Sequence, residues 1–151
     1  MAATTIPWQT TGELATAIRE KKVSSRAVLD ILLERIHRLD RPSEDANDRR
    51  LNSIVVLYEE YARARADAAD EALSQGECWG PLHGVPMTIK ECNFWGKTPC
   101  TNGDPANVRP ALTDHADIEY SPGNEPLVQR LLDAGAIIFG KVEKFHRIYP
   151  F

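Results

Sequence analysis

Hydrophobic residues in the first part of the chain recur at helical spacing. Thr10 and Glu13 have the spacing of a capping box, and apolar residues on one helical face follow them. A second, stronger repeat begins after Ser24 or Ser25, either of which is a residue type that caps helices. We therefore expect residues 12–39 to be helical.

A polar stretch separates this region from a third helical pattern. Residues 41–50 read RPSEDANDRR, and this proline-containing, charged composition predicts a surface loop. Alanines recur at short intervals between Ser53 and Ser74, where their small side chains favour close helix packing, and Gly76 follows as a helix terminator. These features predict a helix over residues 53–75.

Short apolar runs replace the helical pattern after Gly80. Residues 85–89 and 136–139 are compact apolar stretches of the kind found in buried strands. Between them lie an irregular region, residues 92–123, and a helical pattern that ends at Gly135. A strand, a helical crossover and a second strand predict two neighbouring parallel strands in an α/β sheet.

Charge and cysteine content narrow the class of protein. The net charge is −4, and no block of Lys and Arg stands out, so we expect no nucleic-acid partner. Three cysteines without metal-ligand spacing favour neither disulfides nor zinc. The sequence shows no signal peptide or membrane-spanning run, which predicts a soluble, cytoplasmic protein without a membrane partner.

The residues around Lys90 form the most distinctive motif. The stretch GPLHGVPMTIKE, residues 80–91, combines glycines and prolines with an apolar run that ends in Lys90. Most lysines at strand ends are solvated charges, but side chains alternate along a strand, so Glu91 is poorly placed to neutralise Lys90. A lysine at the carboxyl end of a parallel strand also lies where open α/β sheets bind ligands. Lys90 is therefore the candidate functional residue.

This stretch resembles the Gly-Pro-Leu-x-Gly-(Ile/Val)-Pro-(hydrophobic)3-Lys-(Asp/Glu) motif of the amidase signature family. The helical segment upstream and LVQRLLDAGAIIFGKV downstream are also similar to that family. The resemblance implies an α/β fold: the N-terminal part of the family's mixed sheet flanked by helices, with a helical N-terminal segment. On this basis residues 1–151 are an incomplete amidase domain, with residues 1–79 helical and residues 80–151 starting the catalytic core.

The resemblance also implies a chemistry, the hydrolysis of amide carbon–nitrogen bonds by a serine–cis-serine–lysine triad. This chemistry needs no metal and no organic cofactor, so we expect neither. Lys90 matches the lysine of this triad, which acts as the base and must be uncharged to accept a proton. Burial favours the uncharged form of a lysine. Neither triad serine is recognisable: Ser121 is the one serine beyond Lys90, and it reads as a turn residue. The chain is thus expected to be truncated before the serine segment and inactive alone.

The sequence leaves two functions open and predicts two kinds of binding partner. The chain is either part of an amide hydrolase that acts on a small-molecule amide, or a non-catalytic remnant with a role in interaction or assembly. A sheet cut after about two strands exposes an edge, which predicts self-association.

Other residues are weaker candidates for chemistry. Cys92 or Cys100 with His83 would make a thiol and a base, although buried or surface thiols without a role are commoner, and His83 is expected to position backbone or lie at the surface. The remaining candidates are His115 with Asp114 and Asp117, His146, the TNGD segment at 101–104 near a family substrate channel, and Trp79 and Trp95, which are expected to be core or loop anchors.

Overall fold

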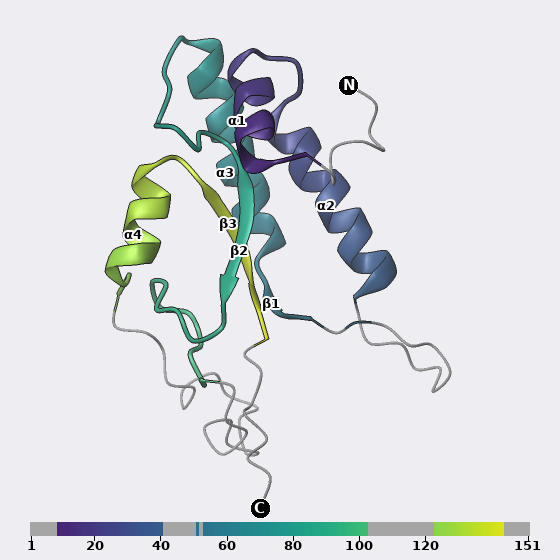
Figure 1. Ribbon diagram of the computed structural model, residues 1–151, viewed down its shortest axis with the longest axis vertical. Helices are drawn as coiled ribbons and strands as arrows, with labels where there is room; N and C mark the ends of the chain where they lie inside the picture. Colours follow the sequence, from purple (N-terminus) through teal and green to yellow (C-terminus); the bar gives the residue numbers. More distant parts are fainter. Residues whose placement is uncertain (1–8, 41–50, 52, 103–122, 144–151) are drawn as a thin grey trace, which may run out of the picture.

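A small sheet lies between two helical layers. The computed structural model describes residues 9–40, 51, 53–102 and 123–143. In Figure 1, α4 lies on one side of the strands and α2 and α3 on the other. The elements are α1 (Thr11–Arg19), α2 (Ser25–Leu39), β1 (Ile54–Leu57), α3 (Glu59–Ser74), β2 (Pro86–Lys90), α4 (Pro126–Asp133) and β3 (Ile137–Val142).

The first two helices begin where the sequence predicts. The Thr10 side chain and the Glu13 backbone and side chain form the expected capping box at the start of α1. Ser24, rather than Ser25, caps α2, and its hydroxyl accepts a hydrogen bond from the backbone N–H of Ala27 at 3.0 Å. Lys21, with φ of 55°, lies in the turn that separates the two helices.

The predicted helix over residues 53–75 is wrong at its start. Residues Ile54–Leu57 form strand β1, and α3 begins only at Glu59. The sequence there, IVVL, is rich in β-branched residues, which favour a strand once a partner is present. The Asp40 carboxylate accepts hydrogen bonds from the backbone N–H groups of Ser53 and Ile54, both at 2.7 Å, so it attaches the start of β1 to the end of α2.

The sheet has β3 in its centre. The strand order is β1-β3-β2, with β2 parallel and β1 antiparallel to β3. The predicted parallel pairing of the two apolar runs is therefore confirmed, and the sheet is mixed. The region before residue 80 is not wholly helical, because it supplies β1 to this sheet.

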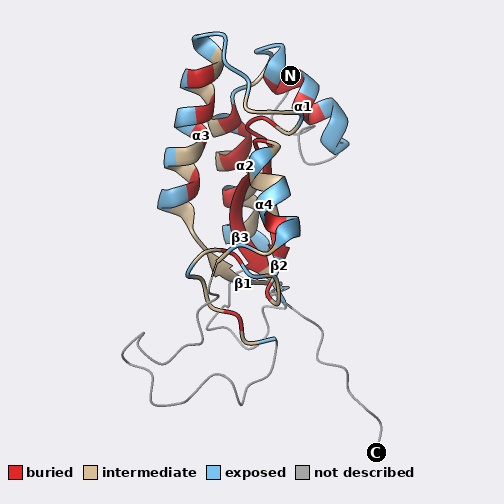
Figure 2. Ribbon diagram, turned by 90° about the vertical axis from the view of Figure 1, so that its left-hand side faces the viewer, coloured by how far each residue is buried: buried red, intermediate tan, exposed pale blue. Residues whose placement is uncertain are grey.

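Alternate residues of β3 face opposite helical layers. Ile137 and Phe139 pack with α2 and α3 in one core cluster, and Ile138 packs in another with Val128 of α4 and Trp95. A third cluster joins α1 and α2 to Val85 before β2. Figure 2 shows exposed residues on the outer faces of the helices and buried ones towards the strands. Coverage on both faces explains why β3 reads as a continuous apolar run.

Candidate active site

A tight, glycine-rich turn leads the chain into β2. The backbone N–H of Leu82 donates to the carbonyl of Ala134 at 2.8 Å, and that of Gly84 donates to Gly135 at 2.9 Å. A Cβ on Gly80 would lie 2.7 Å from the Ala134 carbonyl oxygen. The turn is therefore docked closely against the residues just before β3, and this docking sets the start of both parallel strands.

His83 holds this turn against α3. Its side chain is fully buried, its Nδ1 accepts the backbone N–H of Trp79 at 3.0 Å, and its Nε2 lies 3.0 Å from the carbonyl oxygen of Ala69. Because that oxygen only accepts, the proton is on Nε2. Both ring nitrogens are therefore used by backbone groups. The expectation that His83 positions backbone is confirmed, the alternative of a surface residue is wrong, and His83 has no free nitrogen to activate a thiol.

Gly84 meets the first turn of α2. Its φ of +70° lies in the left-handed region, and a Cβ there would stand 1.9 Å from the Ser25 hydroxyl oxygen. Ser25 is fully buried, and its hydroxyl has no hydrogen-bond partner within the described part of the chain. The second glycine of the motif is therefore required both by backbone conformation and by space.

Lys90 is the last residue of β2, at the carboxyl end of the parallel pair. Its side chain is exposed, whereas Glu91 is buried. Among the described residues, no side chain or backbone group pairs with the Lys90 amine. The expected separation of Lys90 from Glu91 is thus present. The burial expected for a base is not, because nothing in the described ranges covers this strand end.

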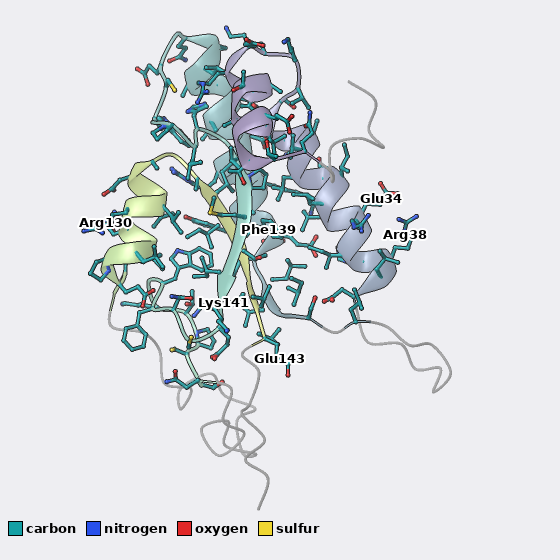
Figure 3. The ribbon with its side chains drawn as sticks, viewed as in Figure 1. Glu34, Arg38, Arg130, Phe139, Lys141 and Glu143 are labelled. Atoms are coloured by element: carbon teal, nitrogen blue, oxygen red, sulfur yellow. The ribbon has the colours of Figure 1, made fainter. Side chains whose placement is uncertain are left out.

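A second lysine, Lys141, was not singled out in the sequence. It belongs to β3, opposite Ile89 in the register, and is fully buried. Figure 3 shows it beside the C-terminal end of β2. Burial lowers the pKa of the Lys141 ammonium, and the neighbouring Cys100 thiol and Glu91 carboxylate oppose that shift. The signal available in the sequence was the lysine that follows the apolar run AIIFG, and a lysine there is typical of an ordinary, solvent-exposed strand end.

The segment after Lys90 is attached to α4. The backbone N–H of Gly96 donates to the Asn124 side chain at 2.7 Å, and the Asn93 amide donates to Glu125. Glu125, not Asn124, occupies the N-cap position of α4, with Pro126 as the first helical residue. The loop that begins at the candidate base is therefore connected to the crossover helix.

The two cysteines considered as nucleophiles differ in their surroundings. Burial raises the pKa of the Cys100 thiol, and the Glu91 carboxylate raises it further, so the reactive thiolate is disfavoured. Cys92 is half-buried. Trp95 is a core residue, as expected, and Trp79 packs against the cluster formed by α2, α3 and β3.

Several sequence candidates lie outside the described residues. These are His115, Asp114, Asp117, Ser121, His146 and the end of the TNGD segment. Within the described ranges, no three His, Cys, Asp or Glu side chains gather in a way that would hold a metal ion. No helix of that part of the chain is long and apolar enough to cross a membrane.

Comparison with known proteins places these features in a family. The family model described as Amidase matches residues 36–144, which include β2, α4, β3 and Lys90. The chain belongs to the amidase family. It is 35% identical over 135 residues to an indoleacetamide hydrolase of Bradyrhizobium diazoefficiens, covering 88% of this chain and 22% of that protein. It is 31% identical over 140 residues to an amidase of Pseudomonas putida, covering 93% of this chain and 26% of that protein.

The fold comparison agrees. The structure of a peptide amidase from Stenotrophomonas maltophilia superposes with a TM-score of 0.70 and 26% identity, covering 91% of this chain and 25% of that one. The chain therefore spans about a quarter of the length of the amidase-family relatives it matches. The predicted family and the predicted α/β fold are both confirmed.

Proposed function

We propose that the chain supplies the base-bearing part of an amidase that hydrolyses carbon–nitrogen amide bonds, with Lys90 as the base. One observation carries this proposal: Lys90 ends β2 at the carboxyl edge of the parallel pair, and its amine has no partner among the described residues. The amine is therefore accessible to a group that approaches this edge of the sheet.

The other members of the triad come, on this proposal, from residues beyond those that resemble the family here. Lys90 accepts a proton through a bridging serine, which frees a second serine to attack the amide carbonyl. The amine of the product then leaves with a proton, and water releases the acyl group. The chain alone supplies the base without a nucleophile, so it is expected to show no turnover.

The test compares two proteins. If the gene continues past Phe151, the longer product should hydrolyse small primary amides and be labelled by a fluorophosphonate, whereas the isolated chain should do neither. Lys90→Ala should abolish turnover by the longer product. Lys97→Ala is the matched control, because Lys97 is an exposed lysine of the following loop.

Three results would count against the proposal. Turnover that survives Lys90→Ala would remove Lys90 from the chemistry. Turnover by the isolated chain that Lys90→Ala removes would show that a nucleophile is present here, with Cys92 as the first residue to test. A longer product that folds but neither hydrolyses amides nor reacts with the fluorophosphonate would favour the interaction or assembly role.

A further inference from the structure

Lys141 is fully buried on the central strand, one position from the pairing partner of Lys90. Ile89 pairs with Lys141 and Lys90 with Val142, so the two lysines lie on neighbouring strands at the same end of the parallel pair. Paired residues share a face of a sheet, and successive residues alternate, so the two side chains leave opposite faces. The molecule therefore has one exposed and one buried lysine beside the proposed catalytic edge.

Three backbone carbonyls surround the Lys141 amine. Its Nζ donates to the carbonyl oxygens of Pro99, Asn93 and Glu91 at 2.6, 3.0 and 3.3 Å. An ammonium has three N–H donors and no acceptor, so these contacts use its whole capacity. A neutral amine would turn its lone pair towards a carbonyl oxygen. The arrangement suits a bound cation and does not suit a base.

All three carbonyls belong to the segment that directly follows Lys90. Lys141 joins the beginning of this loop, at Glu91 and Asn93, to its far side at Pro99. The Glu91 carboxylate accepts the backbone N–H of Thr101, which closes the same loop once more. The Lys141 ammonium therefore binds both the beginning and the far side of the loop after β2 and attaches this loop to β3.

We propose that Lys141 is a positioning residue whose ammonium group holds the loop 91–99, and with it the end of β2 that carries Lys90. The cation takes the place that a bound ion would take in a ring of carbonyl oxygens. The attachment of the loop by Lys141 does not depend on any activity, whereas its consequence for Lys90 rests on the proposed amidase function.

The first test uses the isolated chain and needs no activity. In Lys141→Ala, the hydrogen-bonded amides of this loop should exchange with solvent about tenfold faster or more, because the buried carbonyls lose their donor; these amides belong to Glu91, Asn93, Gly96, Thr98 and Thr101. Ethylammonium or propylammonium should restore protection by occupying the vacated site. Tetramethylammonium, which has the same charge but no N–H group, should not. Equal rescue by both, or unchanged exchange in Lys141→Ala, would overturn the proposal.

A measurement on the unaltered chain decides the matter if Lys141→Ala does not fold. The ¹⁵N signal of the Lys141 side chain should be that of an ammonium at neutral pH, with hydrogens that exchange slowly. A neutral-amine signal at that pH would refute the bound-cation assignment.

Kinetics in a longer, active product separate the two lysines. Alkylamines titrate near pH 10.4, so between pH 7 and 9 the ammonium concentration is nearly constant while the free amine rises roughly tenfold per pH unit. Added amine should restore kcat of Lys141→Ala to the same fraction of the unaltered product's kcat at every pH in this range. Its rescue of Lys90→Ala should rise with pH, since a base must be neutral. A rescue of Lys141→Ala that also rises with pH would make Lys141 a base and contradict the proposal. If the longer product is inactive, only the proposed function fails, and the exchange and ¹⁵N measurements still decide the role of Lys141.

Discussion

Replacing Gly84 by alanine tests whether the approach to β2 is as constrained as its geometry indicates. Gly84 has a φ of +70°, and a Cβ at this position would lie 1.9 Å from the Ser25 oxygen and 3.0 Å from the Ser25 Cβ. Ser25 is fully buried at the start of α2, where its backbone N–H donates to Asp70 at 2.7 Å. The serine therefore has no exposed direction in which to move.

Two terms add to the cost of Gly84→Ala. A left-handed conformation costs a residue with a Cβ about 1–2 kcal/mol. Forcing a methyl group into a packed site costs about 1–3 kcal/mol more. We therefore expect a loss of roughly 2–5 kcal/mol in the free energy of unfolding, a large share of the roughly 5–15 kcal/mol typical of a domain.

The chain contains a control for each term. Gly76 also has a positive φ, +87°, but a Cβ there meets nothing within 4 Å, so Gly76→Ala should cost only the conformational term of about 1–2 kcal/mol. Ser25→Ala removes a buried hydroxyl without a partner among the described residues, and should be neutral or slightly stabilising. Combined with Gly84→Ala, it should recover most of the packing term. Urea unfolding followed by circular dichroism and tryptophan fluorescence gives these free energies.

The reasoning fails on either of two results. One is a Gly84→Ala loss no larger than that of Gly76→Ala, which would mean that the close approach to Ser25 relaxes at no cost. The other is a double variant as unstable as Gly84→Ala alone, since the two positions would then be energetically independent.

Three further predictions concern stability and association. Burial alone would raise the pKa of Asp40, but hydrogen bonds from Ser53 and Ile54 outweigh it and hold the pKa below its ordinary 3.8. Asp40→Asn should therefore lower the free energy of unfolding in urea by about 1–3 kcal/mol at pH 7. The difference between the two proteins should shrink as the pH falls below 3.8, because Asp40 then becomes protonated. An unchanged difference at pH 3 would contradict this. Asp70→Ala removes the carboxylate that accepts the backbone N–H groups of Ser25 and Arg26 at the start of α2, and it should cost about 1–2 kcal/mol. Asp67→Ala only breaks an exposed ion pair with Arg26 and should cost less; equal losses would argue against the capping role of Asp70. The edges of the sheet, β1 and β2, should make the isolated chain self-associate in sedimentation velocity, and a monomer at all concentrations would refute this.

Local signals in the sequence were sufficient for most helix ends and for the parallel strands. Capping groups such as Thr10 and Ser24 act within one helical turn, so their pattern is visible in a short window. Strand β1 was missed because its state depends on a distant partner. Ile54 and Leu57 pair with Val142 and Gly140, and four apolar residues just before an alanine-rich helix read as part of that helix.

The candidate site was accessible to sequence reasoning only in part. Lys90 stood out because glycine, proline and apolar residues around it form a motif. Lys141 did not, since its three partners are backbone carbonyls, and a carbonyl is present whatever the side chain. The burial of Glu91 and the use of both His83 nitrogens likewise depend on contacts between distant segments.

The central position of β3 has a consequence for the order of folding during synthesis. Both β1 and β2 pair with β3, which is the last of the described strands to be made. Helices α1 to α3 depend mainly on local contacts and neighbouring partners, so they are able to form while the chain is still growing. No pairing in this sheet is available until Val142 has left the ribosome, and then two separate segments must meet one strand. Until then, the apolar faces of β1 and β2 are without their sheet partner, and exposed apolar segments of this kind promote aggregation.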